Sequence, residues 1–131
     1  MHLGEVYTGE PGDIAAARHL ASELFRRSTR AGITVAAQAL AEVQLVVSEM
    51  VTNAVKFTAG PCRLDLRVAD GVVEITVSDT SEQMVAALAP DPARVGRHGM
   101  EIVTALCGGF EVTVTPEGKR ISAQLALRPA A

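Results

Sequence analysis

Hydrophobic positions recur at helical spacing in three stretches of the chain. Apolar residues fall about every 3.6 positions in residues 14–29, 34–57 and 96–107, so each stretch predicts an amphipathic helix. Asp13 precedes the first helix and is expected to accept a hydrogen bond from its N-terminus. Pro61 is expected to end the second helix. The predicted core-facing positions of the second helix are Val43, Val47, Met50, Val51 and Ala54.

Elsewhere hydrophobic and polar residues alternate with a period of two, which is typical of half-buried strands. Two pairs of such segments are each separated by a turn sequence, "ADG" in the first pair and "PEGK" in the second, and therefore predict two β-hairpins. A further short run near the N-terminus predicts an edge strand. The predicted strands are residues 3–8, 63–68, 72–79, 109–115 and 120–127.

The order of these elements predicts an α+β fold. Strands joined by hairpins pair antiparallel, and the helices grouped around them are expected to cover one face of the sheet. The result is a two-layer α/β sandwich with a mixed, largely antiparallel sheet. Residues 80–95 show no strong periodicity and contain Pro90 and Pro92, so they are expected to form a loop. The 131 residues are expected to form one domain, residues 1–131.

Composition and charge argue against several classes of function. The net charge is −3, and the chain has three Phe, one Tyr and no Trp, so it lacks the charge and the stacking surface for nucleic-acid binding. Cys62 and Cys107 form no metal-binding cluster and are expected to be small core residues in a reducing compartment. With no membrane-length apolar run and no signal-peptide pattern, a soluble cytoplasmic protein without a membrane partner is expected.

The stretch "LVVSEMVTNAVKFT", residues 45–58, carries polar residues at helical spacing. With Glu42 just before it, Glu49, Asn53 and Lys56 share one stripe opposite the apolar face. By itself this pattern is what any solvent-exposed helix face shows. A functional interpretation therefore needs support from elsewhere in the chain.

Two later features supply that support. The strand predicted at residues 72–79 ends in Asp79, which places a carboxylate at a strand end. "GRHG", from Gly96 to Gly99, begins the third helix, where glycines and the free N–H groups of a helix N-terminus suit phosphate binding. "GRHG" alone is a weak signal, because its glycines can also serve only to turn the chain.

Together, "SEMVTNAVKFT", "VEITVSD" and "GRHGMEIV" resemble, in order and spacing, the Bergerat-type ATPase domain of gyrase, MutL and sensor histidine kinases. The chain is most similar to the short bacterial branch, the anti-sigma-factor serine kinases and small actinobacterial ATP-binding proteins. The resemblance extends from the helix that carries Arg18 to the last strand with its "GK" turn. Larger members have DxGxG where Asp79 is followed here by "TSEQM"; the kinase-like branch often lacks these glycines too.

The resemblance implies a site for ATP and Mg²⁺. Asn53 matches the asparagine whose side-chain oxygen binds Mg²⁺, a hard ion that prefers oxygen ligands. Glu49 matches the carboxylate that acts as general base toward the attacking hydroxyl or water. Asp79 matches the aspartate that accepts a hydrogen bond from the adenine amino group.

The resemblance implies phosphate binding for a second set of residues. Gly96, Arg97, His98 and Gly99 match the glycine box, whose backbone N–H groups meet the phosphates. Lys56 matches a position where histidine kinases often carry a basic residue near phosphate. From the residues alone, Lys56 as a solvent-facing lysine, His98 as a loop-shaping residue and Arg97 as a surface charge stay open as alternatives.

The activity implied is that of a serine/threonine protein kinase that phosphorylates a small antagonist (anti-anti-sigma) protein. The sequence leaves open whether the chain also sequesters a sigma factor and whether it forms the homodimer common in this branch. One alternative is a non-catalytic, ATP-gated binding module. A detached histidine-kinase catalytic domain is disfavoured, because the chain has no upstream dimerisation helices. A scaffold with a merely solvent-exposed stripe is disfavoured by the three concordant motifs.

Overall fold

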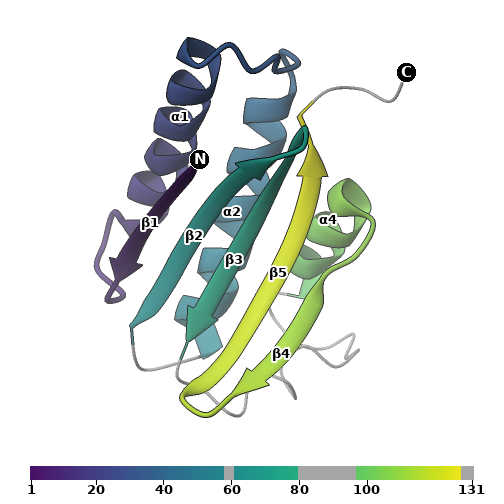
Figure 1. The fold of residues 1–131 in the computed structure, drawn as a ribbon. Coiled ribbons are helices and arrows are strands. Elements are labelled where there is room, and N and C mark those ends of the chain that lie inside the picture. Colours follow the sequence, from purple (N-terminus) through teal and green to yellow (C-terminus); the bar gives the residue numbers. More distant parts are fainter. Residues whose placement is uncertain (58–60, 80–96, 128–131) are drawn as a thin grey trace.

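The computed structural model describes residues 1–57, 61–79 and 97–127. In these residues, strands and helices follow the order β1-α1-α2-β2-β3-α4-β4-β5 (Figure 1). The helices are α1 (Asp13–Arg30), α2 (Ala39–Phe57) and α4 (Arg97–Cys107). The strands are β1 (His2–Tyr7), β2 (Cys62–Ala69), β3 (Val72–Asp79), β4 (Glu111–Thr115) and β5 (Gly118–Ala126).

The strands form one sheet in the order β1-β2-β3-β5-β4, in which every neighbouring pair is antiparallel. The helices lie on one face of this sheet (Figure 1), with α2 in contact with β2, β3 and β5 and with both other helices. The predicted α+β two-layer architecture is therefore confirmed. The strand expected near the N-terminus is also present, at the sheet edge.

The core fills the space between the helices and the sheet. Strand β2 alternates strictly, with Cys62, Leu64, Leu66 and Val68 turned inward, because successive side chains of a strand point to opposite faces. Helix α2 contributes a broad buried face that includes all five predicted positions. The buried apolar residues of α2 are Ala39, Val43, Val46, Val47, Met50, Val51 and Ala54.

The central hairpin has the predicted turn. Asp70 and Gly71 both have positive φ, 54° and 76°, as a two-residue type I′ connection requires. This turn fixes the register in which Ala69 pairs with Val72 and, at the far end, Cys62 pairs with Asp79. The side chain of Asp79 is thereby turned toward the helices.

Four local expectations were wrong. Helix α2 begins at Ala39 rather than at 34; residues 33–36 form neither helix nor strand, and the Ala36 N–H donates to the Leu127 carbonyl at 2.7 Å. Strand β4 begins at Glu111 rather than at 109. Gly118 and Lys119 belong to β5 rather than to a turn. The Asp13 carboxylate accepts from N–H groups of the loop before α1, those of Gly9 and Glu10, rather than from the helix. The predicted loop at residues 80–95 lies outside the described residues.

Candidate functional site

Four element ends lie at the same end of the molecule (Figure 1). They are the C-terminal ends of α2 and β3 and the N-terminal ends of α4 and β5. Helices α2 and α4 pack against each other and run in opposite directions, so the start of α4 lies toward the end of α2. The topology thus brings the three sequence motifs, far apart in the chain, to one end of the sandwich.

The polar stripe of α2 is not uniformly exposed to solvent. Asn53 is 4% exposed, Glu49 one turn earlier is half-buried, and Lys56 in the last turn is exposed. At the other end of the stripe, Glu42 acts on Cys107 of α4: burial raises the pKa of that thiol to about 11, and the Glu42 charge adds to the rise. The stripe therefore lies beside α4 over part of its length, and the purely solvent-facing interpretation fails for Asn53.

The Asn53 amide has unused hydrogen-bonding capacity. Its Nδ2 atom is buried and has no hydrogen-bond partner among the described residues. A buried donor without a partner costs about 1–3 kcal/mol, and most buried polar side-chain atoms do have partners. This is the kind of group that a bound ligand or ion shell satisfies.

Helix α4 offers its N-terminus to the same end of the molecule. Its first turn consists of Arg97, His98, Gly99 and Met100, and the first backbone N–H groups of a helix have no partner within the helix. With the helix dipole, such N–H groups attract anions, phosphates above all. Gly96 and the side chains of Arg97 and His98 lie outside what the structure describes.

Asp79 forms a buried ion pair with Lys119. Lys119 Nζ lies 2.7 Å from Asp79 Oδ2, and the two side chains are 1% and 0% exposed. The pair follows from the register, because Asp79 on β3 is the direct antiparallel partner of Lys119 on β5. Burial lowers the pKa of the Lys119 ammonium, and the Asp79 carboxylate opposes that change.

The ion pair belongs to a lateral row of inward-facing residues. Tyr7 pairs with Cys62, Cys62 with Asp79, and Asp79 with Lys119 across four adjacent strands. Burial raises the pKa of the Cys62 thiol to about 11, with a further contribution from the Asp79 charge and then from Asp13. Burial likewise raises the pKa of Tyr7 to about 12. Cys62 and Tyr7 are therefore neutral at physiological pH, and Lys119 is the residue of this row that forms an ion pair with Asp79.

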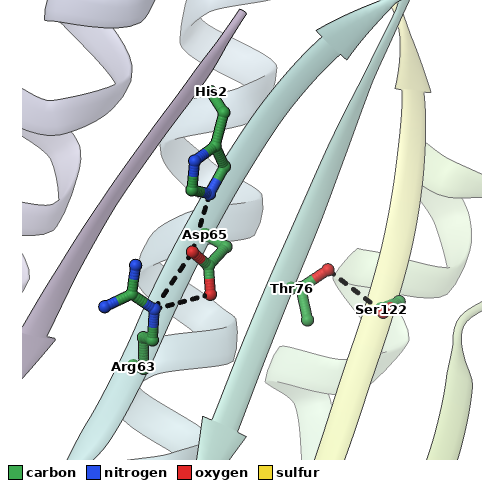
Figure 2. A network of polar contacts seen from close by, with 5 residues as sticks. All are labelled: His2, Arg63, Asp65, Thr76 and Ser122. Atoms are coloured by element: carbon green, nitrogen blue, oxygen red, sulfur yellow. Dashed lines mark hydrogen bonds and ion pairs between the residues drawn. The ribbon is translucent and has the colours of Figure 1, made fainter.

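The opposite face of the sheet carries a different polar surface. Figure 2 shows His2, Arg63 and Asp65 joined by hydrogen bonds and ion pairs, and Thr76 bridging to Ser122 at 3.1 Å. A hollow of about 620 Å³ lies over this face. The hydrogen bonds drawn there link side chains of the face to one another, whereas the amide nitrogen of Asn53 has no partner among the residues that the structure describes.

Lys119 is the residue that the sequence interpretation missed. Ile121, Ala123 and Leu125 of β5 are buried, and alternation carried back by one step places Lys119 on the same face. Reading "PEGK" wholly as a turn hid this position. The strand pattern itself contained the signal.

The described residues contain neither a metal-binding cluster nor a membrane-spanning helix. No group of three or more His, Cys, Asp or Glu side chains in residues 1–57, 61–79 and 97–127 is placed to hold a metal ion. No helix in these ranges has both the length and the hydrophobicity to cross a membrane.

Comparison with known proteins places the chain in a family. The family model of the histidine kinase-like ATPase domain matches residues 7–125, and the chain belongs to this family. The crystal structure of the RsbU and RsbW domains of Rv1364c from Mycobacterium tuberculosis matches with a TM-score of 0.68 and 20% identity, over 99% of this chain and 34% of that one. The chain thus spans about a third of the length of that protein. No curated protein matches the sequence.

Proposed function

We propose that the chain is an ATP-binding, Mg²⁺-dependent serine/threonine protein kinase of the anti-sigma-factor type. The observation that carries the proposal is the buried amide of Asn53 in the C-terminal part of α2, whose nitrogen has no hydrogen-bond partner among the described residues. This end of α2 lies where β3 ends and α4 begins. Membership of the histidine kinase-like ATPase family supports ATP as the ligand. The resemblance to anti-sigma-factor serine kinases, together with the fold match to a chain containing an RsbW domain, supports this branch.

The donor groups present suit a magnesium nucleotide. The Asn53 side chain offers an amide oxygen to Mg²⁺ and an amide nitrogen to a phosphate oxygen or a metal-bound water. Mg²⁺ usually takes only one or two protein oxygens and completes its shell with phosphates and water. When bound, the ion would neutralise charge that develops on the transferring phosphoryl group.

The remaining roles in this proposal are those that the family resemblance implies. Glu49, half-buried one turn before Asn53, takes the proton from the attacking serine or threonine hydroxyl while the γ-phosphoryl group leaves ADP. The backbone of Gly96 to Gly99 binds phosphates at the start of α4, assisted by Arg97 and His98. Lys56, exposed in the last turn of α2, supplies positive charge near the phosphates.

The Asp79 carboxylate accepts a hydrogen bond from the adenine 6-amino group. A carboxylate has about four lone-pair sites, so it can accept from the Lys119 ammonium and from the base together. Its side chain is 0% exposed in this structure, so the base reaches it only after the groups that cover it have moved. The protein substrate in this proposal is a small antagonist protein, and a sigma factor is the second partner.

A second candidate is an ATP-gated binding module without phosphoryl transfer. The observation that favours it is "TSEQM" directly after Asp79, where larger family members carry DxGxG. Both candidates share the nucleotide site and differ in whether Glu49 does chemistry.

Nucleotide binding is tested by thermal unfolding. MgATP at about 100 times its Kd stabilises the folded state by about 2.7 kcal/mol, which raises the Tm by roughly 8 °C for a domain of this size. The rise is expected to disappear in Asn53→Ala, to persist in the neighbouring exposed-site control Val55→Ala, and to be absent with MgGTP. A folded wild-type protein whose Tm does not respond to MgATP would refute both candidates.

A further inference from the structure

The Asp79–Lys119 pair has a consequence for which base the site accepts. Adenine presents a 6-amino donor where guanine presents an O6 acceptor. An ionised carboxylate accepts a hydrogen bond from the 6-amino group of adenine and repels O6 of guanine. A protonated carboxyl group can instead donate a hydrogen bond to O6. The charge state of Asp79 therefore decides which purine fits, if Asp79 reads the base as proposed above.

Lys119 is placed to fix that charge state. Its ammonium lies 2.7 Å from Asp79 Oδ2 in a site with almost no exposed side-chain surface. Burial without such a partner favours the neutral form of a carboxylate over the charged one. Lys119 projects from β5 toward the helices and is 1% exposed, so its ammonium does not reach solvent.

We propose that Lys119 is a specificity-determining residue: by pairing with Asp79 it keeps the carboxylate ionised and makes the nucleotide site select adenine over guanine. This rests on the proposed nucleotide function. Lys119 acts through Asp79 and is a positioning residue rather than a catalytic one.

Among the described residues, the other ionisable groups of this row and of the packed helices are neutral, acidic or exposed. On β2, Cys62 is the direct neighbour of Asp79, and burial raises the pKa of its thiol to about 11, so it stays neutral. On β1, Tyr7 lies next in the same row and is likewise neutral. Among the described side chains, the packed helices carry Asp13 at the start of α1, whose charge acts on Cys62 and Tyr7. They also carry the half-buried Glu49 and the exposed Lys56 on α2, and the exposed Glu101 on α4.

The test is the ratio of the dissociation constants for MgGTP and MgATP, measured by calorimetry at about pH 6 and about pH 9. Wild type is expected to give one high ratio at both pH values. Lys119→Met is expected to lower the ratio at about pH 6 by at least about tenfold, the size of one hydrogen bond to a charged group, and less at about pH 9. Lys119→Arg, which restores the cation, is expected to restore the ratio.

A double variant tests the same role of Lys119 where Lys119→Met alone does not fold, and a third variant serves as the control. The double variant Asp79→Asn/Lys119→Met leaves no unpaired charge, and its amide can donate to guanine O6, so a low ratio independent of pH is expected. Arg120→Met, the next residue in β5 but on the exposed side, is expected to behave as wild type.

The proposal would be overturned if Lys119→Met and the double variant lost affinity for MgATP and MgGTP equally and so kept the wild-type ratio. That result would leave ATP binding itself in place. Absence of MgATP binding to folded wild-type protein would instead overturn the proposed function itself, and with it this inference.

Discussion

The Lys119 ammonium and the Asp79 carboxylate meet at 2.7 Å across β3 and β5, with their side chains 1% and 0% exposed. Each charge is removed from water, and each compensates the other. Removal of one partner of a buried pair costs about 3–5 kcal/mol, whereas replacement of both by apolar groups of similar size is often neutral or stabilising.

We therefore expect Lys119→Met to lower the free energy of unfolding by about 3–5 kcal/mol. The double variant Asp79→Leu/Lys119→Met is expected to regain most of that loss, as urea unfolding would measure. Arg120→Met serves as the matched control and is expected to lie within about 0.5 kcal/mol of wild type. If the losses measured for Lys119→Met alone and for Asp79→Leu alone add up to the loss in the double variant, the two residues are not coupled.

Asn53→Ala is expected to leave the stability of the nucleotide-free protein unchanged or to raise it. The substitution removes a buried amide nitrogen that has no partner among the described residues, so the desolvation cost of that group is recovered. Urea unfolding without nucleotide measures the effect. The control on the same helix is Gln44→Ala, which loses bonds to the Arg18 carbonyl at 3.1 Å and the Ser22 hydroxyl at 2.9 Å and should lose about 1–2 kcal/mol. A loss in Asn53→Ala as large as that in the control would assign Asn53 a structural role.

Glu49→Gln separates a kinase from a binding module. The amide keeps the shape of the side chain but cannot take the proton of the attacking hydroxyl, so phosphoryl transfer to the protein substrate is expected to fall about 10²- to 10⁴-fold with MgATP affinity retained. Glu42→Gln, two turns earlier on α2, is the control. Transfer at the wild-type rate in Glu49→Gln would remove Glu49 from the chemistry.

The Cys62 thiol makes stability fall at alkaline pH. Its pKa rises from 9.0 in the unfolded chain to about 11 in the folded one, through burial first and the Asp79 charge second. Because the thiol has the higher pKa in the folded state, its contribution to the free energy of unfolding is fully present below about pH 9. This contribution is lost as the pH rises through about 11. A shift of two units corresponds to about 2.7 kcal/mol.

The free energy of unfolding of wild type minus that of Cys62→Ala should fall by about 2.7 kcal/mol between about pH 8 and about pH 11.5. The same comparison cancels the parallel contribution from Tyr7, whose pKa is raised by burial to about 12. A difference that does not change with pH would show that the thiol titrates alike in the folded and unfolded chains.

The central hairpin of the sheet was predictable because its turn sequence and its alternation of hydrophobic and polar residues can be recognised within a short stretch of the chain. "ADG" predicts a type I′ turn, and strict alternation in 63–68 and 72–79 fixes which side chains are buried. The start of α2 was not predictable in this way, since the chain before it makes a long-range contact, from the Ala36 N–H to the carbonyl of Leu127 near the other end of the chain.

The candidate site was only partly predictable. Helical spacing placed Glu49 and Asn53 on one stripe, but the burial of Asn53 depends on tertiary packing that no single helix encodes. Lys119 is the opposite case. The alternation of β5 predicts that its side chain points inward, but a lysine directly after a turn sequence is usually exposed to solvent. Only the register opposite Asp79 reveals its partner.

The most direct test of the nucleotide site is a map of backbone amide chemical shifts on addition of MgATP to wild-type protein. If the nucleotide binds as proposed, the largest changes cluster at the C-terminal end of α2, the end of β3, the first turn of α4 and the start of β5, around Asn53, Asp79 and Lys119. Changes centred instead on the exposed sheet face around Arg63 and Thr76, or no changes at all, would contradict the proposed site.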